Sequence, residues 1–126
     1  MKRILAVAVV VGCALSFGAN AGEKSRSLTN EEKTNVEKAV KATLKDPDSA
    51  TFKHTKLVLS GDGVVDRYCG MVNAKNSYGG YTGYSVFFVG ITANKDGERV
   101  AIYLGPQEES DIAQQSVMEM CAKYGY

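Results

Sequence analysis

Tryptophan is absent from this chain, and histidine occurs only once, as His54. A catalytic triad needs a histidine together with a nucleophile and an orienting acid, and a zinc site needs several Cys or His ligands. Because His54 stands between Lys53 and Lys56, we expect a solvated surface residue rather than a general base. The sequence therefore predicts no catalytic residue, no metal site and no cofactor, and a protein that is not an enzyme.

The chain also lacks an excess of either charge and lacks a long apolar segment. Lysine and arginine number 15 against 14 aspartates and glutamates, so no basic stripe that would bind nucleic acid is evident. The longest apolar run, Ile4 to Phe17, is shorter than the roughly 20 residues that a spanning helix needs. We expect neither a nucleic-acid partner nor a transmembrane helix.

What stands at the N-terminus is a secretory pattern. Lys2 and Arg3 precede the apolar run, and Ala19-Asn20-Ala21 closes it with the small residues of a cleavage site. This order predicts a signal peptide over residues 1–21 and a periplasmic or secreted protein. After removal of the signal, we expect a flexible lead-in over residues 22–28 and a single domain over residues 29–126.

A second interpretation of the same segment is a lipobox. Val10-Val11-Gly12 precedes Cys13, which would then be lipidated and anchor the protein in the outer membrane. Against it, the residues after Cys13 are apolar, where a polar tether is expected. A lipid at Cys13 would be the only reason to place this protein at a membrane.

Three cysteines are few, and their number supports export. Removal or lipidation of Cys13 leaves Cys69 and Cys121 as an even pair, without a C-x-x-C redox motif. We predict a disulfide between them; the alternative is two buried free thiols.

The pattern downstream predicts an α+β domain. Thr29 and Glu32 form a capping box before a helical stripe that ends at Asp46-Pro47-Asp48. Four strands should follow, and a last helix should bury Cys121 together with Ala113, Val117, Met120 and Tyr124. The expected strands cover residues 52–60, 64–74, 84–92 and 99–104, and the last helix covers 108–123. We predict a four-stranded antiparallel meander in the order α-β-β-β-β-α, with both helices on one face of the sheet.

One stretch has the composition of a binding loop. Residues 73–84 hold three tyrosines and three glycines; tyrosine offers contact area at low entropic cost, and glycine allows close approach of a backbone. The functional interpretation is a recognition surface, and the structural alternative is a set of tight bends with tyrosines covering the sheet edge. The candidate binding residues are Lys75, Asn76, Tyr78, Tyr81 and Tyr84.

Two motifs also carry a resemblance. Lys45 to Phe52 fits KDPxSAxF, and Cys69 to Gly83 fits CGxVNxKNxxGGYTG. Residues 30–92 thereby resemble a group of small exported bacterial and prophage-borne proteins without an established activity. The resemblance implies export and a compact fold, and it marks residues 69–84 as the segment that defines the group.

These observations lead to a first hypothesis, a non-enzymatic binding module of the bacterial cell envelope. It would recognise a protein or a glycan through residues 75–84, and the resemblance suggests an inhibitor or a prophage exclusion factor. The alternative is a structural accessory subunit of an envelope complex, whose mark would be a sizeable exposed apolar patch.

Overall fold

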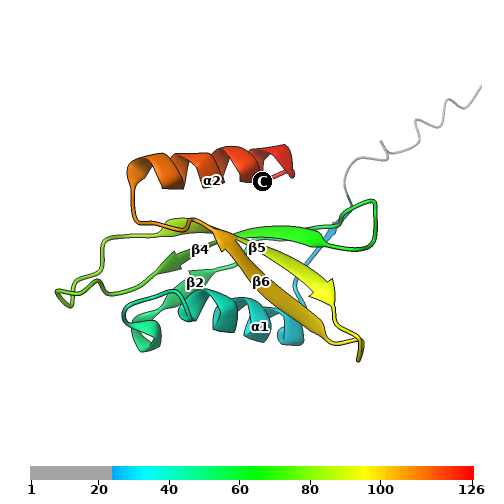
Figure 1. The fold of residues 1–126 in the computed structure, drawn as a ribbon, viewed down its shortest axis with the longest axis horizontal. Helices are drawn as coiled ribbons and strands as arrows, with labels where there is room; N and C mark the ends of the chain where they lie inside the picture. The colour runs from blue at the N-terminus through cyan, green and yellow to red at the C-terminus, as the bar shows by residue number, and fades with distance from the viewer. Residues whose placement is uncertain (1–23) are drawn as a thin grey trace, which may run out of the picture.

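The computed structural model describes residues 24–126; the predicted signal peptide and Cys13 lie outside this range. Figure 1 shows a twisted sheet between two helices, with the loop of residues 74–84 extending from one end of the sheet. The elements are β1 (Ser25–Arg26), α1 (Asn30–Lys41), the 3₁₀ turn η1 (Pro47–Ser49), β2 (Thr51–Lys53), β3 (Leu57–Val58), β4 (Asp66–Asn73), β5 (Ser85–Ala93), β6 (Arg99–Gly105) and α2 (Asp111–Lys123).

Helix α1 begins at the predicted capping box. The Thr29 hydroxyl accepts from the Glu32 backbone N–H at 3.1 Å, and the Glu32 carboxylate accepts from the Thr29 N–H at 2.9 Å. These bonds satisfy two of the N–H groups that a helix start leaves without partners. The helix ends at Lys41, before the predicted stop at Pro47, which begins η1 instead.

The predicted antiparallel meander is confirmed, with the strand order β2-β4-β5-β6. A hairpin joins β5 to β6, in which the Asn94 N–H donates to the Glu98 carbonyl at 2.9 Å. Gly97 adopts a φ of 80°, which explains the glycine at this turn. The sheet therefore pairs strands that are close in sequence, as expected of a meander.

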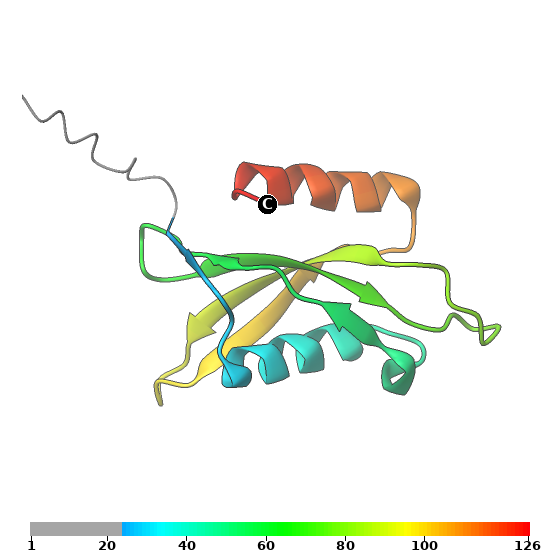
Figure 2. The same ribbon diagram turned by 180° about the vertical axis from the view of Figure 1, so that it is seen from behind.

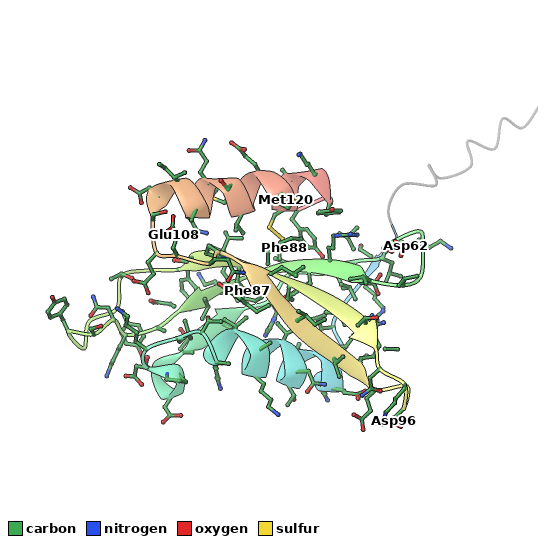
Figure 3. All side chains as sticks on the ribbon, viewed as in Figure 1. Asp62, Phe87, Phe88, Asp96, Glu108 and Met120 are labelled. Atoms are coloured by element: carbon green, nitrogen blue, oxygen red, sulfur yellow. A yellow bond between two sulfur atoms is a disulfide. The ribbon has the colours of Figure 1, made fainter. Side chains whose placement is uncertain are left out.

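The prediction that both helices lie on one face is wrong, because α1 and α2 cover opposite faces (Figures 1 and 2). Neighbouring residues of a strand point to opposite faces, and the two cores divide accordingly. Phe87 packs with Val36 and Val40 of α1, whereas Phe88 packs with Val117 and Cys121 of α2. Figure 3 shows Phe87 and Phe88 on the two sides of the sheet.

The predicted disulfide between Cys69 and Cys121 is confirmed, with the two Cα atoms 6.0 Å apart. It joins β4 to α2 across the smaller core. Val117 and Cys121 are the buried residues of α2, and Met120, predicted to be buried, is 39% exposed. The disulfide is thus a main attachment of this helix.

The segment 52–60 is not one strand, as predicted, but two. β2 pairs with β4, whereas β3 pairs with β1, so residues 54–56 carry the chain from one partner to another. β1 and the buried Leu28 belong to the predicted flexible lead-in, and that prediction is therefore wrong for residues 25–28. The short β1-β3 ribbon extends the domain beyond its predicted start.

Candidate functional site

The Tyr/Gly loop, residues 74–84, is a hairpin between β4 and β5 that is ordered from within by Asn76. The Asn76 side-chain oxygen accepts from the backbone N–H of Tyr78 at 2.9 Å and of Gly80 at 3.2 Å. Its backbone pairs with Gly80 and Gly79, and Lys75 forms a β-bridge with Tyr81. The predicted binding residue Asn76 thus acts as the scaffold of the turn.

The three tyrosines of the loop differ in exposure and in contacts. Tyr78, at the tip, is 96% exposed. The Tyr81 hydroxyl donates to the Ser49 carbonyl at 2.9 Å, and the Tyr84 hydroxyl lies 3.4 Å from the Thr51 hydroxyl. Tyr81 and Tyr84 therefore tie the loop to the segment after α1, while Tyr78 projects into solvent.

Lysines lie against the two tied tyrosines. The Lys75 ammonium group is 5.8 Å from the centre of the Tyr81 ring, and that of Lys53 is 4.2 Å from the Tyr84 ring. Lys75 is further held by its backbone N–H, which donates to the Ser49 hydroxyl at 2.8 Å. Of the five predicted binding residues, Tyr78 alone has its side chain turned wholly to solvent; the other four are partly engaged in holding the loop.

A groove of about 770 Å³ opens beside the base of the loop. Its lining comes from the end of α1, the loop and the connection from β6 to α2. Figure 1 shows these three segments at the same end of the sheet. Val40, Val72 and Phe87 contribute apolar surface to its lining. Charged residues line it too: Lys45, Lys75, Glu108, Glu109 and Asp111.

We compared the chain with family models, curated proteins and solved structures. None of them matches it. The resemblance carried by the two sequence motifs therefore stays an expectation, and the function has to be argued from this chain's own residues.

The prediction that His54 is a solvated surface residue is wrong, since its side chain is only 16% exposed. Its Nδ1 lies 2.8 Å from the Tyr68 hydroxyl and its Nε2 lies 3.0 Å from the Glu37 carboxylate. Burial raises the pKa of Tyr68 to about 12, so this hydroxyl is protonated and can donate to Nδ1. His54 is a structural link between α1 and β4, with both ring nitrogens engaged.

The structure contains a buried charge network that the sequence analysis did not predict. Glu32, recognised in the sequence as a capping residue, is 0% exposed and binds Arg26 at 2.6 and 2.9 Å and Arg99 at 3.2 Å. Arg99 also donates to Asp66 at 2.6 Å, and Asp66 is itself only 9% exposed. Arg99 lies 67 residues from Glu32 and 33 from Asp66, and no local pattern connects it to either.

Among residues 24–126, no three His, Cys, Asp or Glu side chains gather as a metal site would require. Within the same range, no helix has the length and apolar character to cross a bilayer. The loop with its groove is accordingly the candidate site.

Asn76→Ala tests whether this side chain orders the loop. We expect the amides of Tyr78 and Gly80 to exchange with deuterium faster, because both lose their acceptor, while the free energy of unfolding falls by only about 1 kcal/mol. Ser77→Ala, in the same exposed turn, is the control. Unchanged exchange at Tyr78 and Gly80 would show that the turn holds without Asn76.

Proposed function

We propose that this protein is an exported, non-enzymatic binding module of the bacterial cell envelope that recognises a protein or a glycan through the Tyr/Gly loop. An inhibitor or a prophage exclusion factor is the form of this function that the motif resemblance favours. The observation that carries the proposal is Tyr78, 96% exposed at the tip of an internally hydrogen-bonded turn.

An ordered loop that presents a free aromatic ring suits recognition. A tyrosine ring left in water gains nothing for folding, whereas its burial against a partner removes a large apolar area from water. Because Asn76, Tyr81 and Tyr84 already hold the loop, little conformational entropy remains to be lost on binding. The loop therefore has the preorganised form that favours affinity.

The export part of the proposal rests on the N-terminal pattern and on the disulfide. Structural disulfides are typical of proteins in oxidising compartments and rare in the cytosol, and Cys69 and Cys121 form one here. The proposed location is the periplasm or the exterior, with an outer-membrane anchor as the alternative if Cys13 is lipidated.

Tyr78→Ala is expected to abolish capture of the partner from an envelope extract and to leave the melting temperature nearly unchanged, because the ring contacts little of its own chain. The experiment uses the mature chain, residues 22–126, as bait. Val64→Ala is the matched control, since Val64 is 64% exposed and precedes β4, whereas the loop follows β4. Equal capture by the Tyr78→Ala variant and the wild type would exclude the loop tip as the recognition element.

A structural accessory subunit is the second candidate, and a specific observation favours it. Ile102 and Leu104 are 56% and 41% exposed on β6, an edge strand of the sheet. Ile112 and Met118 add exposed apolar surface on α2. If Ile112→Ala loses the partner and Tyr78→Ala keeps it, this second function replaces the first.

A further inference from the structure

The sheet has a notch at the end of β6. The last pair between β5 and β6 is Phe88 with Gly105, and beyond Gly105 the chain turns away toward α2. β5 continues back to Ser85 and still pairs there with β4. In the described chain, residues 85–87 thus have a strand on one side and no strand on the other.

A side chain occupies the place of the missing strand. The Val86 N–H donates to the side-chain oxygen of Gln114 at 2.9 Å, and the Gln114 side-chain nitrogen donates to the Val86 carbonyl at 2.9 Å. This pair of bonds is what one residue of an antiparallel strand exchanges with its neighbour. The Gln114 amide therefore stands in for the peptide groups of a neighbouring strand.

The groove beside the loop includes this notch, since Ser85, Val86, Phe87 and Gln114 all line it. Its volume of about 770 Å³ falls within the range of about 300 to 1,000 Å³ that is usual for ligand sites. Its charged lining is of both signs, with three carboxylates from residues 108–111 and two lysines, Lys45 and Lys75. Figure 3 shows Glu108 near the start of α2, at the end of the sheet from which the Tyr/Gly loop extends.

We propose that an extended peptide segment of the protein partner binds in this notch, pairs with Val86 as an added strand and displaces the side-chain amide of Gln114. Addition of a strand to an open sheet edge is an established mode of peptide recognition, in which backbone hydrogen bonds supply affinity and side-chain pockets supply specificity. The inference rests on the proposed binding function and narrows its partner from a protein or a glycan to an extended peptide.

The groove charges define the chemistry of the peptide. Glu108, Glu109 and Asp111 attract a lysine or arginine side chain, and Lys45 with Lys75 attract an acidic residue. The bound peptide is therefore extended, with a basic side chain toward the start of α2 and an acidic side chain toward the base of the loop.

The test selects peptides from a phage-displayed library of random linear dodecamers against the mature chain, residues 22–126. We expect enrichment of sequences that contain both a basic and an acidic residue. The best synthetic peptide is then titrated by fluorescence anisotropy, and its effect on the Val86 backbone amide and the Gln114 side-chain amide is followed by NMR. Both resonances should shift on binding.

Two variants decide the mechanism. Gln114→Ala should tighten binding about five- to tenfold, because the peptide no longer competes with the internal amide, whereas a direct contact role for Gln114 predicts weaker binding. The double variant Glu108→Lys/Glu109→Lys should weaken binding at least tenfold. Gln115→Ala and Glu119→Lys, exposed on α2 and outside the groove lining, are the controls.

The proposal is overturned if no peptide is enriched, if Gln114→Ala leaves the affinity unchanged or lowers it, or if an array of envelope glycans binds and the peptides do not. Its failure is distinguishable from that of the proposed function. Loss of partner capture by Tyr78→Ala with no effect of the groove variants would leave the loop as the site and refute the notch. If Tyr78→Ala leaves peptide binding at the notch unchanged, the notch remains as the site and the loop tip is refuted as the recognition element.

Discussion

Replacing both Cys69 and Cys121 with alanine is expected to lower the free energy of unfolding by about 4 kcal/mol. The disulfide joins residues 52 apart in sequence, and the chain-entropy model gives about this stabilisation for a loop of that length. The double variant avoids leaving one unpaired thiol. The measurement is urea unfolding at pH 7, followed by circular dichroism.

The loss of stability on removal of the disulfide should be concentrated in α2. This helix has Val117 and Cys121 as its buried residues, whereas α1 has Glu32, Val36 and Val40 in the larger core. Without the cross-link, hydrogen exchange should accelerate more in α2 than in α1, because fewer buried contacts resist local opening.

Wild-type protein under reducing conditions provides the matched control for the cross-link. A reductant should bring the wild type to the stability of the double alanine variant and leave the variant itself unaffected. The disulfide assignment itself is tested by alkylation of the unreduced, unfolded mature protein. Two alkylated thiols in the intact mass, or equal urea midpoints for wild type and variant, would contradict this prediction.

Glu32→Gln is expected to cost about 3 kcal/mol at pH 7, even though the two side chains have nearly the same size. The carboxylate is fully buried and accepts from both terminal nitrogens of Arg26, from Arg99 and from the Thr29 backbone. A neutral amide leaves two guanidinium groups short of their counter-charge and points an N–H₂ group at donors. Breaking a buried ion pair from one side costs about 3 to 5 kcal/mol.

The difference in the free energy of unfolding between the wild type and Glu32→Gln should depend on pH in a defined direction. The hydrogen bonds from Arg26 lower the pKa of Glu32 from 4.5 to about 2. Burial opposes this shift, whereas the hydrogen bonds from the Thr29 N–H and from Arg99 add to it. A carboxyl group with a lowered pKa in the folded state stabilises the protein fully above its unfolded pKa, and it loses that contribution as the pH falls through the folded pKa. A shift of this size corresponds to about 3 kcal/mol at neutral pH.

The stability gap between the two proteins should therefore be constant from pH 7 to about pH 5 and should close between about pH 4.5 and pH 2. Urea midpoints at several pH values measure it. Glu31→Gln is the matched control, because Glu31 lies in the same first helical turn but is exposed, so it should cost about 0.5 kcal/mol through the helix dipole alone. An equal cost for Glu31→Gln and Glu32→Gln would show that the network contributes no more than surface charge.

Local sequence determined several elements of this fold. The capping box of Thr29 and Glu32 and the Asn94–Gly97 turn act over a few residues, so each could be recognised without the rest of the chain. The disulfide was also predicted from the sequence, because the expected removal or lipidation of Cys13 leaves a single pair of cysteines. The loop was singled out by composition, although its division into a free Tyr78 and the anchoring Tyr81 and Tyr84 was not.

Tertiary structure alone decided which face each helix covers, where residues 52–60 divide, and which groups meet at the notch and around Glu32. The physical reason is that these outcomes depend on contacts between distant residues. Glu32 and Arg99 are 67 residues apart, and Val86 and Gln114 are 28 apart. A helical stripe specifies that a helix must bury one side, but it does not specify which face of the sheet that side packs against. Nothing in the sequence around Gln114 reveals that its side-chain amide pairs with the edge of β5.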